Sequence, residues 1–461
     1  MTTNGIFPSD PNGITGASIS RRNMLKLSGF LAIAGTAALA GCSTGSTTTD
    51  ASSAATGSVD PSSFKGITLN VGCNPTDVQA AQAAGKLWAD KYGVTVNAQV
   101  IPYAERATDY ATMIVSKDPH YDVLFGSVDF VSNFGDKIYL DLGDLGGATS
   151  DLLPAALGQL SKGGKLYAAP LFADMEFFIY NKKLWSAAGL DPTKVPTTWD
   201  ELFALAPQLL STGKDANATP WTSIGVPYWI SFYNSLGGQL FNEDKTELLF
   251  DNDQALQTWK TVEKGFQTKF FGAAGATAGG DADSQILFNQ GLAASEINTV
   301  GFWAQTQSTD PQYKVSISKD DVGVMVMPGI NAGTSGSIIV SEGFGVNKFG
   351  KNQDAALAFV KYMCGPEFQK QLVLGQAGTV LPPASISVGS DPQVKDAFPI
   401  APLLAEQAKA QLTWPGNAPY NWNAPFLLGI TNLFKGTWTA EQAHSETVKA
   451  VQQLIVQYLA A

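Results

Sequence analysis

The sequence predicts an α/β fold with two or more domains. Its 461 residues are more than one ordinary hydrophobic core usually organises. Short apolar strand patterns alternate with helix-period patterns near the start of the chain and again in its middle. Because such alternation is typical of parallel sheets covered by helices, we expect each domain to hold a mostly parallel sheet flanked by helices.

The expected elements begin after a polar leader region. An apolar strand at 67–73 is followed by a helix at 77–92, which Gly93 should end, and by an alternating strand at 94–101. The later elements predicted in the same way are a helix at 104–117, strands at 121–125, 177–180 and 341–346, and helices at 199–210, 253–268, 354–364 and 440–459.

The first 41 residues have the composition of an export signal. Arg21, Arg22 and Lys26 precede an apolar run at 27–40, which is shorter than the roughly 20 residues that span a bilayer as a helix. The arginine pair with Leu25 and Lys26 resembles a twin-arginine signal, and a general secretion signal is the alternative.

A cysteine directly follows this run, in the sequence LAGC ending at Cys42. These four residues resemble the lipobox of bacterial lipoproteins, which implies lipidation of Cys42. The segment 42–65 is rich in Ser and Thr and is expected to be a flexible tether, with a reach of about 25 Å. We therefore expect an extracytoplasmic protein anchored by lipid alone to the outer face of the cytoplasmic membrane, in a Gram-positive bacterium.

The acidic net charge and the small number of histidines and catalytic motifs argue against several classes of function. The chain has a net charge of −11, and because residues 1–41 carry +2 (three basic residues and Asp10), the remainder carries −13. Such an acidic body disfavours nucleic acid as a partner. With two histidines and no phosphate-binding or nucleophile motif, we expect no metal, no cofactor and no enzyme activity. Cys73 and Cys364 are expected to be buried free thiols, with a disulfide between them left open.

One dense set of motifs indicates a family. GKLYAAP (164–170), YNKKLW (180–185), AGLDP (188–192) and PTTWDEL (196–202) follow one another in this order. They resemble the extracellular solute-binding proteins of ABC importers, in the carbohydrate-binding branch that includes maltose-binding protein. Further similar stretches, such as VMVMPG (324–329) and AALAF (355–359), extend the resemblance over about 66–461.

The resemblance implies a periplasmic-binding-protein-like fold with two lobes joined by hinge strands. It places 66–172 with 338–385 in the N-terminal lobe and 173–337 with 386–461 in the C-terminal lobe. It also implies a monomer that captures a carbohydrate in the interlobe cleft and delivers it to the permease subunits of an ABC transporter.

Carboxylates, amides and aromatic rings are the groups that a sugar site needs, because sugars present hydroxyls around apolar C–H faces. The resemblance implies that Asp129 and Asp174 contact ligand. Asn74 and Asp77, after the first strand, and Glu176 are further polar candidates, and we place Glu176 on the opposite side of its segment from Asp174.

The aromatic candidates lie in three later segments. Trp303 follows a predicted strand, as does the tryptophan that stacks on ligand in the family. Trp229 precedes a double glycine, at about the position of another family aromatic, and Tyr228 is its alternative. Near the C-terminus, Tyr420 and Trp422 occupy the segment in which the family supplies another cleft aromatic.

Two alternatives remain open at this point. The first is a binder of another polar solute, such as a glycerophosphodiester or a polyamine. The second is an exported glycoside hydrolase that uses Asp174 and Glu176, whose carboxyl groups would have to lie about 5–5.5 Å or 6.5–9.5 Å apart.

Overall fold

The computed structural model describes residues 60–460 apart from 76, 212–218, 222–224, 273–280, 307–310, 378, 417 and 419, and gives the backbone alone at 103–104, 281–283, 302–304, 312 and 411. The signal segment, Cys42 and most of the expected tether lie outside the described residues. The described body begins with a 3-10 turn, Pro61–Phe64, and Phe64 is buried against the first core.

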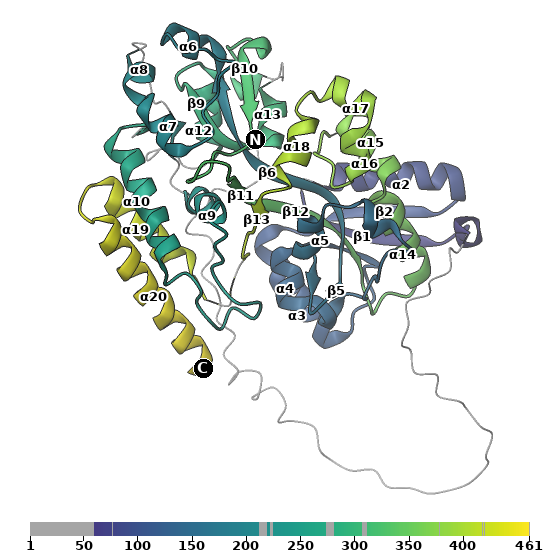
Figure 1. Cartoon of the computed structure of the whole chain (residues 1–461). Helices are drawn as coiled ribbons and strands as arrows, with labels where there is room; N and C mark the ends of the chain where they lie inside the picture. Colours follow the sequence, from purple (N-terminus) through teal and green to yellow (C-terminus); the bar gives the residue numbers. More distant parts are fainter. Residues whose placement is uncertain are drawn as a thin grey trace, which may run out of the picture.

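Three parallel strands form the centre of the first lobe (Figure 1). β1 (Thr68–Cys73) pairs along its whole length with β2 (Thr95–Val100) and, on its other side, with β3 (Val123–Ser127). The connecting helices are α2 (Val78–Tyr92) and α3 (Tyr103–Ser116). Gly93 ends α2 in the left-handed conformation, at φ 69°, which glycine adopts without steric cost. The predicted order and boundaries are confirmed here to within about two residues.

Two long strands connect this sheet to the second lobe. β6 (Ala169–Asn181) is buried at all 13 positions, and β12 (Ile339–Val346) pairs with it and with β3. β6 continues beyond β12 to pair with β9 (Ser295–Thr299) and β10 (Val322–Met325). The strand order is β10-β6-β12-β3-β1-β2, with β9 also on β6. One continuous strand therefore belongs to both halves of the molecule.

The second lobe differs from our expectation in the direction of its strands. Among the described residues, β9 and β10 both run antiparallel to β6, whereas we expected a mostly parallel sheet in each lobe. The described parallel pairs there are short: β7 (Thr219–Pro220) with β8 (Phe271–Gly272), β11 (Gly336–Ser337) with β13 (Gln411–Leu412), and an isolated bridge between Thr198 and Gly329. The chain reaches β9 and β10 through long excursions, and these return it in the reverse direction.

Two hydrophobic cores lie on either side of these crossing strands. The first surrounds β1, β3 and α14 (Gln353–Met363). The second is rich in aromatic rings: Trp259 of α10 (Asp253–Gln267) stacks on Phe426 of α19 (Asn423–Phe434) at 6.0 Å between ring centroids. The predicted helix at 199–210 is two short helices, α7 (Trp199–Ala204) and α8 (Ala206–Leu210), because Pro207 sits in the first turn of a new helix.

Helices cover both lobes. α10, α19 and α20 (Ala440–Ala460) lie together along one outer side of the second lobe (Figure 1). None of the helices in the described ranges is long and apolar enough to span a membrane. The remaining elements are α4 (Val128–Ile138), α5 (Pro154–Gln159), β4 (Ser161–Lys162), β5 (Lys165–Leu166), α6 (Lys182–Ala187), α9 (Val226–Asn234), α12 (Asp281–Asn289), α13 (Val300–Gln305), α15 (Pro366–Val373), α16 (Ile386–Ser390), α17 (Pro392–Ala397) and α18 (Ala401–Gln407), with 3-10 turns at Ala148–Asp151, Pro311–Tyr313 and Lys319–Asp321.

Both described cysteines are free and buried, as expected from the sequence. Burial raises the pKa of the Cys73 thiol and of the Cys364 thiol. The Cys364 thiol donates a hydrogen bond to the backbone oxygen of Ala169 at 3.2 Å, which ties α14 to the start of β6.

Candidate functional site

The candidate site lies where the carboxyl ends of β1 and β3 meet the crossing strands. Residues that follow the ends of parallel strands come together at one edge of a sheet, which is where open α/β sheets usually bind ligands. Asn74 and Asp77 follow β1, and Asp129 lies in the first turn of α4, directly after β3. Three of the sequence-predicted site residues therefore share this edge.

Asn74 is the centre of a polar network in the first lobe. Its side-chain oxygen accepts a hydrogen bond from Arg106 Nη2 at 3.1 Å, and its Nδ2 donates to Glu342 Oε2 at 3.2 Å. Arg106 is fully buried, also donates to the backbone oxygen of Ile101, and lies over the ring of Phe125 at 4.6 Å. A guanidinium that is already engaged in this way holds Asn74 in one orientation.

Glu342 and Arg106 were not among the sequence-predicted site residues. Glu342 lies on β12 with Ser127 of β3 and Phe172 of β6 as its neighbours. Burial and the negative charge of Asp77 raise the pKa of the Glu342 carboxyl, with a smaller contribution from Asp129, against lowering by Asn74 and Arg106. The only sequence signal was an acidic residue inside an otherwise apolar strand.

Asp129 meets the second lobe. A side chain at Gly416 would lie 2.7 Å from the Asp129 carboxylate, so the glycine permits the loop after β13 to approach α4 closely. Lys245 is also near: burial lowers its pKa to about 8, and the charge of Asp129 acts in the opposite direction. The loop that carries Lys245 contacts the first lobe again at Glu243, whose carboxylate accepts a hydrogen bond from the backbone N–H of Gly163 at 2.8 Å.

Asp174 lies on β6 where the chain passes between the lobes. It is buried, and its carboxylate accepts hydrogen bonds from the backbone N–H groups of Met175 and Val300 at 3.0 and 2.9 Å. Burial raises its pKa to about 6, although the backbone N–H groups that donate to the carboxylate act in the opposite direction. Val300 begins α13, the helix that carries Trp303.

Glu176 is buried on the same strand and faces α9. Its carboxylate accepts a hydrogen bond from the Ser231 hydroxyl at 2.5 Å. Our expectation that Glu176 and Asp174 point to opposite sides was wrong, because β6 is uninterrupted and side chains two residues apart on a strand share a face. Their different hydrogen-bond partners nevertheless give the two carboxylates separate surroundings.

The aromatic candidates occupy different environments. Trp229 is fully buried and packs against Trp259 and Phe426, so it belongs to the second core and is not brought to the junction. Trp422 is also buried, and its indole N–H donates to the backbone oxygen of Gly416 at 3.0 Å, beside Asp129. The Trp303 side chain lies outside the described part of the structure.

Tyr420 and Tyr228 are both held by their hydroxyl groups. The Tyr420 hydroxyl donates to the backbone oxygen of Lys245 at 2.6 Å, which joins the C-terminal loop to the loop that contacts the first lobe. Tyr228, the alternative to Trp229, is buried and donates to the backbone oxygen of Ile297 at 3.1 Å. Tyr420 is therefore the candidate that lies with the junction residues.

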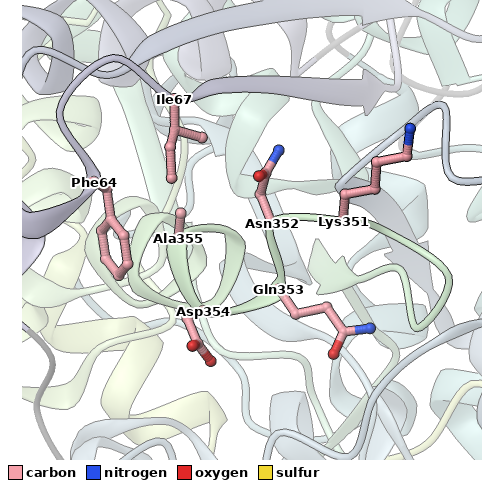
Figure 2. Close-up of a pocket in the computed structure, with 7 residues that line it drawn as sticks. All are labelled: Phe64, Ile67, Lys351, Asn352, Gln353, Asp354 and Ala355. Atoms are coloured by element: carbon pink, nitrogen blue, oxygen red, sulfur yellow. The ribbon is translucent and has the colours of Figure 1, made fainter.

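A hollow of about 350 Å³ lies elsewhere, at the opposite end of β1 (Figure 2). Phe64 and Ile67 line one side of it, and residues 351–355 at the start of α14 line the other. Ile67 precedes β1 whereas Asn74 follows it, so this hollow is distinct from the candidate site.

Comparisons with known proteins agree with this architecture. Over 244 residues the chain is 27% identical to a probable amino-acid ABC transporter periplasmic-binding protein of Sinorhizobium fredii, covering 52% of each chain. Over 276 residues it is 25% identical to the mannitol-binding protein of Pseudomonas aeruginosa, covering 57% of this chain and 59% of that one. The chain thus spans about half the length of the curated relatives it matches.

A solved structure shows the same fold. Maltose-bound MalE3 of T. maritima superimposes with a TM-score of 0.68 at 21% identity, covering 84% of this chain and 100% of that one. The sequence model of the family described as bacterial extracellular solute-binding protein matches residues 74–370, well over half of the chain. With the two-lobed α/β architecture already established, this match shows that the chain belongs to the bacterial extracellular solute-binding proteins.

Proposed function

We propose that this protein captures a carbohydrate between its two lobes and delivers it to the permease of an ABC transporter. The observation that carries the proposal is the meeting of the two lobes at the junction, where Asp129 of the first lobe lies near the loops that carry Lys245 and Trp422. Asn74 lies at the same edge of the first sheet and is hydrogen-bonded to Glu342. Charge-assisted hydrogen bonds to hydroxyls and contacts with aromatic rings are the interactions by which proteins bind sugars. The relatives named for mannitol and maltose support the same class of ligand.

In this proposal the polar contacts come from Asn74, Asp77, Asp129, Asp174 and Glu176, and the aromatic contacts come from Trp303, Tyr420 and Trp422. Trp229 acts in folding instead, because its ring is covered by other core rings. The sugar binds without bond breaking, and closure of the lobes around it presents the loaded form to the permease.

The direct test is calorimetry of the purified protein with maltose, D-mannitol and other sugars. Binding of a sugar with micromolar or tighter affinity is the expected result. Binding of an amino acid, a polyamine or a glycerophosphodiester in place of every sugar would assign the protein to another solute. The panel should include amino acids, because the Sinorhizobium relative is named as a probable amino-acid transporter protein.

We propose that the protein is not an enzyme, and the same samples test this point. Asp174 and Glu176 lie on the same face of β6, and glycoside hydrolases use a pair of carboxyl groups. Glycoside hydrolysis is therefore the activity that the test must exclude. Chromatography of the sugars after long incubation should show no products. Turnover that is lost in Asp174→Asn would overturn the proposal.

The division expected from the sequence was 66–172 with 338–385 and 173–337 with 386–461. We propose the same division with the last crossing moved to the region near residue 412, because the buried side chains of Val394 and Leu404 pack with the first core. Limited proteolysis of loops near these boundaries would test the division.

The protein is proposed to work as a monomer tethered through a lipid on Cys42. Residues 1–41 would be removed on export, and the segment after Cys42 would hold the body near the membrane of a Gram-positive cell. Cys42→Ala should release the protein from the membrane fraction without changing its affinity for sugar. Membrane attachment that persists in this variant would contradict the lipid anchor.

A further inference from the structure

Glu342 lies at the place where the first lobe meets the crossing strands. Its neighbours across the sheet are Ser127, at the end of β3, and Phe172 of β6. The pairing of β12 with β6 shifts register between Glu342 and Gly343. Irregularities of this kind are common next to functional sites, and the Glu342 carboxyl here lies within hydrogen-bond distance of Asn74.

The two oxygens of the Glu342 carboxyl differ in their surroundings. Oε2 accepts a hydrogen bond from Asn74 Nδ2 at 3.2 Å. Within the described part of the chain, Oε1 makes no hydrogen bond, and Glu342 is only partly covered. Because Arg106 donates to the oxygen of the Asn74 amide, the amide nitrogen faces Glu342 and holds its Oε2 atom.

Three charged groups of the first lobe act on Glu342. Asp77 precedes α2, Arg106 lies in α3 and Asp129 begins α4, while Asn74 follows β1. Burial and two nearby carboxylates outweigh the lowering by Asn74 and Arg106, so the pKa of the Glu342 carboxyl is raised, which favours its protonated form. Since Oε2 accepts from Asn74, the proton resides on Oε1.

We propose that Glu342 is a further ligand-binding residue, which donates a hydrogen bond from Oε1 to a hydroxyl or ether oxygen of the carbohydrate. The inference rests on the proposed function of the same site. A neutral carboxylic acid acts here as a donor, as buried acids do in other sites that require one. The ligand would consequently need an acceptor oxygen at this position, and a deoxy analogue that lacks it would bind more weakly.

The test compares Glu342→Gln, Glu342→Ala and the wild type, with Glu367→Gln on the exposed side of α15 as control. The probe is the member of the sugar panel that the wild type binds, titrated calorimetrically between about pH 6 and about pH 9. Wild-type affinity should fall as pH rises and the proton leaves Oε1. Glu342→Gln, which keeps an N–H donor, should remain within about threefold of the wild type at the acid end and lose the pH dependence. Glu342→Ala should lose about tenfold.

The pH profile separates a ligand contact from a structural role, because a change in packing alone would not flatten it. If Glu342→Gln loses as much affinity as Glu342→Ala, or if both bind with the wild-type profile, the inference is overturned. If the wild type binds no sugar of the panel, the proposed function fails, and the inference fails with it. Unfolding midpoints of the variants identify any loss that comes from misfolding, and Glu342→Gln then carries the test because it preserves the shape of the side chain.

Discussion

The carboxylate of Glu243, in a loop of the second lobe, accepts a hydrogen bond from the backbone N–H of Gly163, in the β4–β5 turn of the first lobe. The same loop carries Lys245, which lies near Asp129. The backbone oxygen of Lys245 accepts a hydrogen bond from the Tyr420 hydroxyl. This loop is therefore a bridge between the lobes beside the candidate site.

Removing the bridging carboxylate should loosen the closed arrangement. In Glu243→Ala we expect sugar affinity to fall about twofold to fivefold, mostly through faster dissociation, because the bond is exposed to water and contributes little by itself. Stopped-flow tryptophan fluorescence would measure the dissociation rate. Glu247→Ala, an exposed glutamate of the same loop, is the matched control. Equal rates in the two variants would show that the bridge does not hold the lobes.

Trp229 should matter for folding and not for ligand contact. Its ring is fully buried against Tyr233, Trp259 and Phe426, and truncation of such a residue leaves a large cavity. Trp229→Ala should lower the free energy of unfolding by about 3–5 kcal/mol, measured by denaturant titration. Tyr458→Ala, at a side chain 40% exposed on α20, should change it far less. If Trp229→Ala is stable but no longer binds sugar, Trp229 contacts the ligand and this prediction is wrong.

Asp174 should make the ligand-free protein more stable as the pH falls. Its pKa is raised from 3.8 to about 6 in the folded state because the carboxyl is buried. The folded protein therefore binds more protons than the unfolded chain between these values, and the free energy of unfolding increases from about pH 6 down to about pH 4 by up to about 3 kcal/mol.

Asp174→Asn should remove this part of the pH dependence, since the amide oxygen can still accept from Val300 and carries no charge. Denaturant titrations at several pH values, with the exposed Asp396→Asn as control, would measure it. A slope that is identical in wild type and Asp174→Asn would contradict the assignment.

The two buried thiols should be inert in the native protein. Cys73 and Cys364 are free and buried, and burial raises both pKa values, so little reactive thiolate forms. In a soluble form that begins after Cys42, a chromogenic thiol reagent at neutral pH should label neither cysteine before unfolding and both after it. Rapid labelling of the native protein would mean that α14 or β1 opens readily.

Features of the fold that depend on neighbouring residues in the sequence were predicted well. Features that depend on tertiary contacts were predicted poorly. The capping box of Thr198 and Glu201 is a local pattern of the first kind, because its partners lie three residues apart, and both of its hydrogen bonds are present. The extent of β6 was not readable: a strand buried on both faces has no polar alternation, and only residues 177–180 of it were predicted.

The candidate site follows the same division. Asn74 and Asp77 were proposed because they follow a strand, and strand ends can be located from hydrophobic patterns. Asp129 was proposed from the family resemblance. Glu342 was missed because its contact with Asn74 joins residues 268 positions apart. Trp229 was assigned to the ligand because a tryptophan in a core and one at a binding site have the same sequence signal, and only the rings packed around it distinguish them.

The passage of β6 through both sheets has a consequence for how the molecule can be divided. Since the one strand supplies backbone partners to β12 on the first side and to β9 and β10 on the second, a half-molecule that lacks it would have an open edge in its sheet. Neither lobe can then be excised as a self-sufficient unit. Thermal unfolding should accordingly proceed as a single cooperative transition, in spite of the two separate cores.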